Sequence, residues 1–155
     1  MYKRILVPVD GSETSNRGLK EAIALARQSG AQLRLLHVVD ESVLALTPEV
    51  GVVDLSDSLR DSGRKVLAKA VALAERSGVK AETSMPENLT GRVSDAILRE
   101  ARKWRADVVV MGTHGRRGLS HMLLGSDAEG VVRSSPVPVL LVRGHARNRA
   151  RAKRA

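Results

Sequence analysis

The stretch from Met111 to Ser126 has the residue types and the spacing best suited to chemistry. Gly112 and Gly115 follow a short apolar run, and nine residues separate Gly115 from the pair Gly125 and Ser126. Glycines let backbone N–H groups approach phosphate oxygens closely, and the start of a helix adds unpaired N–H groups and the positive end of the helix dipole. The spacing therefore allows both ends of the stretch to converge on one anion.

A second interpretation of the same residues needs no ligand. The glycines then form only a turn, and Ser126 caps the following helix, with Glu129 at the third helical position completing a capping box. The residues alone leave both interpretations open. They disfavour two nucleotide-binding classes, because the stretch lacks the lysine of a P-loop and the sequence has no G-x-G-x-x-G pattern.

Catalytic and metal-binding side chains are sparse. The chain has no cysteine, which excludes disulfides, thiol catalysis and zinc-thiolate sites. The four histidines lack the spacing of a metal site, so we predict no metal held by protein side chains alone. His114 is the only candidate base near the glycines. Nothing in the sequence orients it, so we favour a histidine that hydrogen-bonds backbone or phosphate and assign no catalytic residue.

Strands and helices alternate along the chain. Short apolar runs predict strands, and apolar residues spaced by three and four predict helices. The predicted strands cover residues 5–9, 33–39, 80–85, 107–111 and 136–142. The predicted helices begin at Ser12, at Ser56 or Asp57, after a cap at Thr90, and at Ser126. Residues 40–55 have no helical period, so we expect a long loop there.

Five strands that alternate with four helices predict an α/β fold with a doubly wound parallel sheet. Parallel neighbours need crossover helices, and such crossovers are right-handed. Ligands of these sheets bind at the carboxyl ends of the strands, where the winding changes sides. This rule selects Asp10, Val39 and the loop after Met111 as candidate site residues.

Three separated motifs resemble the universal stress protein family. The first is the start ILVPVDGS, residues 5–12, and the last is the run PVPVLLV, residues 136–142. The motif between them consists of a glycine, two residues, a glycine, nine residues and then Gly-Ser. It resembles the ATP-binding signature of that family, and every defining position is filled. The likeness covers residues 1–143. It implies a Rossmann-like fold of the adenine nucleotide alpha hydrolase type.

The resemblance also implies roles for individual residues. Asp10 would contact the ribose of ATP, in addition to or instead of capping a helix, and Val39 would hold adenine through its backbone. The phosphates would be surrounded by Gly112, Gly115, Gly125 and Ser126. The other predicted contacts are Pro8, Val9, Met111, His114, Arg116 and Asp127. Any Mg²⁺ or Mn²⁺ would arrive with the nucleotide.

Asp127 departs from the family pattern, because many relatives carry an apolar residue after the Gly-Ser pair. A carboxylate in the first turn of a helix favours the helix dipole but repels a nearby triphosphate. If Asp127 points inward, we expect weaker binding of ATP relative to ADP or AMP. Arg116 and Arg117 either offset this repulsion or are simply solvated.

Most of the net charge of +9 lies in the C-terminal tail. Residues 143–155 contribute +6 with no acidic residue, so we divide the chain into a domain, residues 1–143, and a basic tail, residues 144–155. Such a tail binds nucleic-acid phosphates or is a disordered terminus, and we favour the second because no aromatic residue accompanies the arginines. The first apolar run is too short for a signal peptide or a membrane span, so we expect a cytoplasmic protein without membrane contact.

Together these features predict a nucleotide-responsive regulatory module for stress tolerance with at most slow ATP hydrolysis. ATP would order residues 112–125, and with them 40–55, and so change a surface that an unidentified protein partner recognises. We expect the apolar edge strand from Val137 to Val142 to pair with its copy in a homodimer, as in the family. Two alternatives stay open: a protein that associates with nucleic acid through its tail, and a family member that binds no nucleotide.

Overall fold

The computed structural model describes residues 1–46, 52–114 and 124–144. Its main sheet is parallel and has five strands in the order β4-β2-β1-β6-β7. These strands are β1 (Arg4–Pro8), β2 (Gln32–Leu36), β4 (Ala81–Ser84), β6 (Val108–Gly112) and β7 (Val139–Val142). The helices are α1 (Glu13–Ser29), α2 (Val52–Arg76), α3 (Val93–Trp104) and α4 (Ser126–Ser134). The predicted fold class is therefore confirmed.

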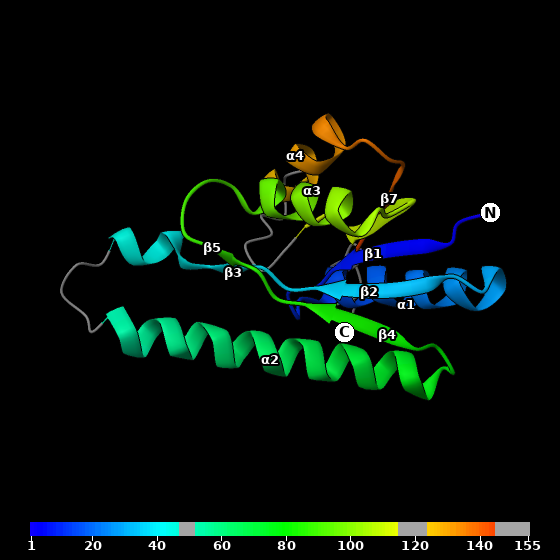
Figure 1. Cartoon of the computed structure of the whole chain (residues 1–155), viewed down its shortest axis with the longest axis horizontal. Helices are drawn as coiled ribbons and strands as arrows, with labels where there is room; N and C mark the ends of the chain where they lie inside the picture. Colours follow the sequence, from blue (N-terminus) through cyan, green and yellow to red (C-terminus); the bar gives the residue numbers. More distant parts are fainter. Residues whose placement is uncertain (47–51, 115–123, 145–155) are drawn as a thin grey trace, which may run out of the picture.

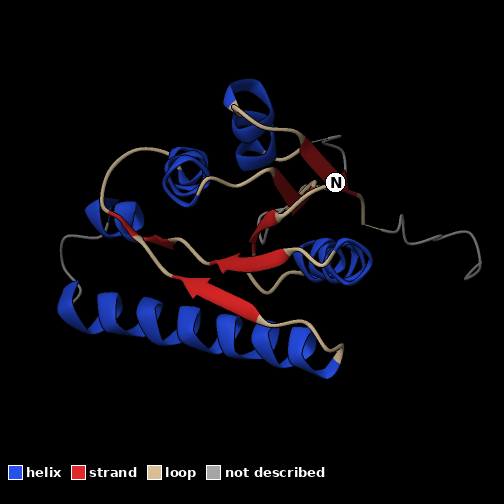
Figure 2. Ribbon diagram, turned by 45° about the vertical axis from the view of Figure 1, so that its right-hand side comes forward, coloured by secondary structure: helices blue, strands red, loops and turns tan. Residues whose placement is uncertain are grey.

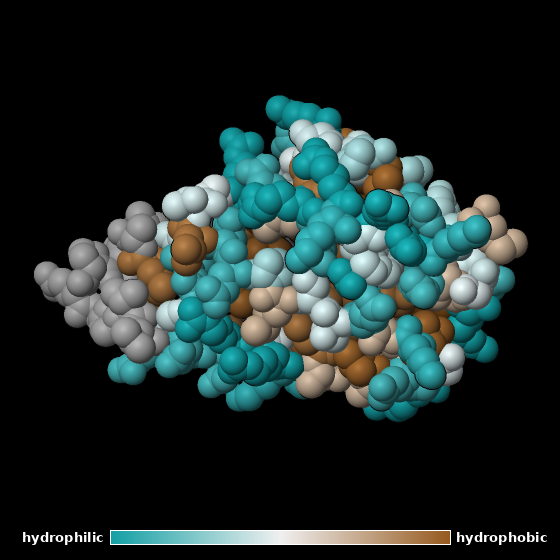
Figure 3. All heavy atoms as spheres, in the orientation of Figure 1, coloured by the Kyte–Doolittle hydropathy of each residue, from teal (hydrophilic) through white to brown (hydrophobic). Residues whose placement is uncertain are grey.

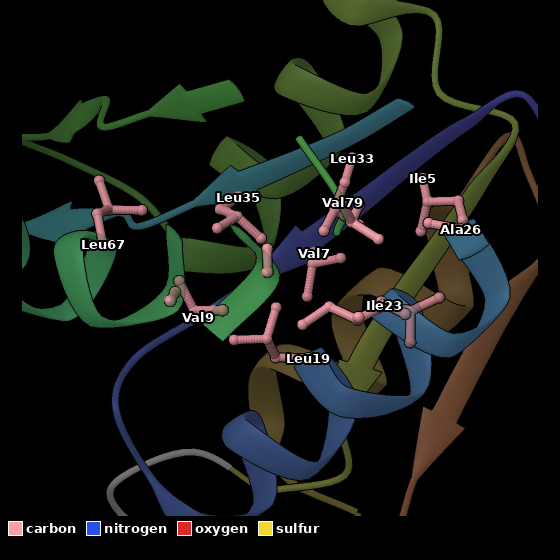
Figure 4. Packing of buried hydrophobic residues seen from close by; sticks show 14 of the residues in the cluster. Ile5, Val7, Val9, Leu19, Ile23, Ala26, Leu33, Leu35, Leu67 and Val79 are labelled. Carbon is pink, nitrogen blue, oxygen red and sulfur yellow. The ribbon is translucent and has the colours of Figure 1, made fainter. Parts of the chain in front are cut away.

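The helices form two layers around the sheet (Figures 1 and 2). Side chains of α1 and α2 pack on one face and those of α3 and α4 on the other. On the first face Ile5 and Val7 of β1 and Leu33 and Leu35 of β2 belong to one buried cluster with Leu19 of α1 (Figure 4). With no phenylalanine in the chain, small branched residues fill these layers and bring helix and sheet backbones close together.

The strand order reverses between β1 and β6. From β1 the chain winds outward through β2 to β4, then returns through α3 to β6 on the other side of β1 and continues to β7. The connections that follow β1 and β6 therefore lead away from each other, one toward β2 and the other toward β7. In doubly wound folds, ligands bind in the crevice that such a divergence opens at the carboxyl ends of the strands.

A small second sheet lies beyond the carboxyl ends of β2 and β4. In it β3 (Val39–Asp40) pairs in parallel with β5 (Glu87–Asn88), and a 3₁₀-helix, η1 (Glu41–Leu46), follows β3. The prediction of a long loop over 40–55 is wrong, because η1 forms and α2 already begins at Val52. Residues 47–51 lie outside the described residues.

Three predicted helix caps are also wrong. Ser56 lies inside α2, where its hydroxyl donates to Glu41 Oε1 at 2.6 Å instead of capping backbone, and Asp57 lies one residue further along. Arg92 rather than Thr90 precedes α3, and its N–H donates to the carboxylate of Asp95. A predicted capping box at α4 does not form, because Gly125 is the cap residue there and the Glu129 side chain pairs with Arg133.

Polar residues cover most of the surface drawn in Figure 3. Apolar side chains gather mainly along its lower part, where Leu67, Val71 and Met85 line a shallow groove of about 500 Å³ between α2 and β4. None of the helices that the structure describes is long and apolar enough to cross a membrane.

Candidate nucleotide-binding site

The two ends of the glycine-rich stretch meet at the carboxyl end of β6. The Gly125 N–H donates to the carbonyl of Thr113 at 2.7 Å, and the Thr113 N–H donates to Val142 of β7 at 3.0 Å. Gly125 adopts an extended conformation (φ −71°, ψ 159°), after which α4 begins at Ser126. We call residues 112–114 and 124–126 the glycine corner. It joins a strand end to the start of a helix, as the spacing predicts.

Helix α1 packs directly against the glycine corner. A Cβ at Gly112 would lie 2.8 Å from the carbonyl carbon of Thr14 and 2.9 Å from its oxygen. A Cβ at Gly18 would lie 3.1 Å from the Gly112 nitrogen. Glycine is needed at position 112 because backbone, not a movable side chain, occupies the space. A lone glycine within a helix, as at Gly18, is a sequence signal for this kind of close approach.

Asp10 stands at the carboxyl end of β1, next to the strand-order reversal. Its Oδ1 accepts the N–H of Ser12 at 2.9 Å, and its own N–H donates to the Ser15 hydroxyl at 3.1 Å. Ser12, not Asp10, caps α1, since its hydroxyl accepts the Ser15 N–H at 3.2 Å. The alternative role of Asp10 as the helix cap is therefore wrong. The turn fixes its carboxylate, which is half-buried, beside the crevice.

The segment His37–Asp40, which we call the β3 corner, forms the other wall at the carboxyl end of β2. Val39 is 1 % exposed, and its N–H donates to the Pro86 carbonyl at 2.9 Å, toward β5. The His37 N–H points the same way and donates to Ser84 of β4 at 3.0 Å. Because backbone groups alternate sides along an extended chain, those of Val38 face the opposite side, toward the end of β1.

Charged side chains fasten the β3 corner to its surroundings. Arg60 of α2 bonds Glu87 of β5 at 2.7 Å and Glu41 of η1 at 3.1 Å, and Glu41 is nearly buried. The hydrogen bond that Arg60 donates to Glu87 is the main reason why the pKa of Arg60 is raised above its ordinary value, so this cation stays charged. Asp40 accepts the Ser42 hydroxyl at 2.6 Å and lies 3.5 Å from the Asn88 amide. Strand β3 is thus tied to β5, η1 and α2.

No catalytic array is evident in the part of the chain that the structure describes. Thr113 Oγ1 lies 3.0 Å from His114 Nδ1, which places the ring beside the strand end, and His114 is half-buried. These described residues contain no group of three or more His, Asp or Glu side chains that would hold a metal ion.

The structure gathers most of the predicted site residues at one edge of the sheet. Pro8 ends β1, the buried Val9 precedes Asp10, and Met111 and Gly112 end β6. Ser126 is exposed and Asp127 is half-buried in the first turn of α4. Gly115, Arg116 and Arg117 lie outside the described residues.

Several site residues were not among those predicted from the sequence. Thr14 contacts Gly112 across α1, and Thr113, 4 % exposed, connects β6 to both β7 and Gly125. The orientation of Val38 became visible only with the partners of its neighbours. Of these residues, only Thr113 could have been selected from the sequence, because it lies within the glycine motif, between Gly112 and Gly115.

Comparison with known proteins places the chain in a family. The family model described as "Universal stress protein family" matches residues 1–143. The chain belongs to the universal stress protein family. Its relatives include the universal stress protein MJ0531 of Methanocaldococcus jannaschii, which is 40 % identical over 144 residues, with 92 % of this chain and 83 % of the relative covered.

Solved structures agree with this assignment to the universal stress proteins. The structure of MJ0577, also from Methanocaldococcus jannaschii, superposes with a TM-score of 0.84 at 31 % identity and covers 94 % of this chain and 99 % of that one. A universal stress protein solved in complex with cAMP superposes with a TM-score of 0.66 at 25 % identity and covers 92 % and 97 %. The chain therefore shares its fold and family with proteins of which one was solved in complex with a nucleotide.

Proposed function

We propose that this universal stress protein binds ATP in the crevice between the glycine corner and the β3 corner and acts as a nucleotide-responsive regulatory module in stress tolerance. The hydrogen bond from Gly125 to Thr113 carries the proposal, because it holds a strand end and a helix start together at the strand-order reversal. Backbone N–H groups at such a place favour a phosphate chain. The relative solved with cAMP supports an adenine nucleotide.

In this proposal the phosphates lie at Gly112, Gly115, Gly125 and Ser126, with His114 and Arg116 beside them. Pro8 and Val9 form the floor next to Asp10, whose carboxylate accepts the ribose hydroxyls. Any Mg²⁺ or Mn²⁺ enters with the nucleotide. The absence of cysteine supports a reducing compartment such as the cytoplasm.

For the adenine we assign the backbone of Val38 in place of Val39. The Val39 N–H is already bonded to Pro86, and its side chain is buried. Val38 directs one donor and one acceptor toward the end of β1, and among the described residues none forms a hydrogen bond with either group. The edge of adenine that carries its amino group offers the matching acceptor and donor.

Calorimetric titration of ATP, ADP, AMP and cAMP with Mg²⁺ into wild type and Gly125→Val tests the proposal. Valine adopts the extended conformation of Gly125 without strain, so the variant should fold, but its side chain blocks the approach of phosphate to the backbone. We expect wild type to bind ATP and the variant to bind at least about tenfold more weakly. A wild type indifferent to millimolar nucleotide would refute the proposal.

We also propose that ATP acts by ordering the 112–125 loop, which changes a surface recognised by a protein partner, and that hydrolysis is slow at most. The 3.0 Å contact between His114 Nδ1 and the Thr113 hydroxyl supports a hydrogen-bonding role for this histidine rather than that of a general base. Single-turnover hydrolysis at an enzyme-like rate, lost in His114→Ala, would contradict the second part.

For the oligomeric state we propose a homodimer through β7. This strand ends the sheet, and Leu140 on it is 44 % exposed. The strand begins at Val139 rather than Pro136, so the pairing segment is shorter than the sequence predicts. Sedimentation should show a dimer at micromolar concentration that Leu140→Asp converts to monomer, since a charge at an apolar interface is unfavourable.

A further inference from the structure

The hydrogen-bond ladder between β1 and β2 is interrupted one step beyond the strand ends. Along the ladder the odd-numbered residues of β1 bond the even-numbered residues of β2, from Lys3 with Gln32 to Val9, whose N–H donates to Leu36 at 2.8 Å. The next bond in this series would run from the Val38 N–H to the Val9 carbonyl. That bond is not present. His37 Nδ1 lies 2.8 Å from the Val9 oxygen instead.

The imidazole therefore takes the place of the Val38 N–H. A carbonyl oxygen only accepts, so Nδ1 must carry the proton and donate it to Val9. This satisfies the last carbonyl before Asp10. It also leaves the Val38 N–H and carbonyl free to meet a ligand.

A glycine of α2 makes room for the ring. A Cβ at Gly63 would lie 2.7 Å from His37 Cδ2, 3.1 Å from its Nε2 and 3.0 Å from Met85 Sδ. Glycine inside a helix is destabilising relative to alanine, so a buried glycine in the interior of α2 calls for a local reason. The slot for the imidazole supplies one.

We propose that His37 is a positioning residue for the nucleotide site: its Nδ1–H holds the Val9 carbonyl and thereby keeps the backbone edge of Val38 open for the base, while Gly63 fixes the ring. This inference rests on the proposed function in assigning the base to Val38. It adds that base recognition depends on a side chain that need not touch the nucleotide.

Three substitutions at one position separate positioning from packing. His37→Asn places an amide donor near the Nδ1 position, His37→Gln places it near the Nε2 position, and His37→Leu removes it. We expect His37→Leu and His37→Gln to bind ATP about tenfold more weakly and His37→Asn to restore most of the affinity. Inorganic tripolyphosphate, which has no base, should bind all four proteins equally, because the glycine corner is unchanged.

Gly63→Ala provides an independent variant on another element. The new methyl group must displace the imidazole, so ATP binding should weaken while tripolyphosphate binding and thermal stability are maintained. A loss of affinity for both ligands, together with a lower melting temperature, would indicate a packing role and overturn the proposal. So would unchanged ATP binding in His37→Leu.

Amide hydrogen exchange supplies a readout without nucleotide. In wild type the Val38 amide should exchange rapidly, and in His37→Leu it should slow at least about tenfold as it takes over the Val9 carbonyl. If wild type binds no ATP, the proposed function fails and this measurement decides the role of His37 alone. An unchanged Val38 exchange rate would then overturn that role as well.

Discussion

The glycine corner and the β3 corner lie at the carboxyl ends of strands on either side of β1, yet they are held by different means. The glycine corner depends on backbone groups and on the close approach of α1, with Thr14 against Gly112. The β3 corner depends on side chains from three elements, above all Arg60 between Glu41 and Glu87. The first should therefore be intolerant of any added atom, and the second sensitive to the loss of single charges.

The largest effect should follow Gly112→Ala. Its methyl group would enter space occupied by the Thr14 backbone, which cannot rotate away, so we expect a loss of about 1–3 kcal/mol in unfolding free energy. ATP binding should fall as the corner shifts. Thermal unfolding and calorimetry measure both effects.

Gly144→Ala is the matched control for Gly112→Ala. There the nearest atom is the Thr14 hydroxyl at 3.1 Å, which is able to move. Equal stability loss in the two variants would mean that close backbone packing does not distinguish the glycine corner.

The next largest effect is expected for Arg60→Gln in the β3 corner. Removal of the cation leaves the nearly buried Glu41 without its ion pair and releases β5 from α2. We expect amide exchange over residues 40–46 to accelerate and ATP to bind about three- to tenfold more weakly. Tripolyphosphate binding should not change, because the phosphates lie in the other corner.

Arg64→Gln, one turn further along α2, is the control for Arg60→Gln. Its ion pair with Asp61 is exposed on both sides and should contribute little. Similar acceleration of exchange in both variants would show that the β3 corner is not specifically fastened by Arg60.

The difference between a corner built from backbone groups and one held by side chains also explains which features could be predicted from the sequence. The order of strands and helices follows from apolar runs, and the glycine corner follows from spacing within the 15 residues from Gly112 to Ser126. Backbone approach to phosphate needs little more than small residues at set positions. Short-range patterns of this kind are readable without a structure.

The β3 corner was not predictable for a physical reason. Its contacts join residues far apart in sequence, such as Arg60 with Glu87 and Asp40 with Asn88, which no local period records. The prediction of a loop over 40–55 failed because η1 depends on these contacts. In our proposal the contact with the base moves from Val39 to Val38, because the side to which a backbone group points depends on neighbouring strands and is not written in the sequence.

A smaller effect is expected for Asp127→Ala at the start of α4. The half-buried carboxylate should repel a triphosphate more than a monophosphate, so its removal should strengthen ATP binding relative to AMP by about two- to fivefold. The ratio of the two dissociation constants at low and at moderate salt measures this. Glu129→Ala, an exposed carboxylate in the same helix that pairs with Arg133, should leave the ratio unchanged. An equal change in both variants would indicate only a general charge effect.

The smallest effect on ATP binding is expected for Asp107→Asn, a substitution at the opposite end of the sheet. The backbone N–H groups of Lys3 and Arg4 donate to Asp107 Oδ2 at 2.7 and 2.8 Å and lower the pKa of its carboxyl below the ordinary value of 3.8. A lowered pKa in the folded state means that this carboxylate stabilises the fold above pH 3.8 and loses its effect as the pH falls through the folded pKa. Asp107→Asn should therefore melt below wild type at pH 7, by a margin that narrows toward pH 3, while ATP affinity at pH 7 stays the same. A change in ATP affinity would mean that the two ends of the sheet are coupled, and that neither corner is held by its local contacts alone.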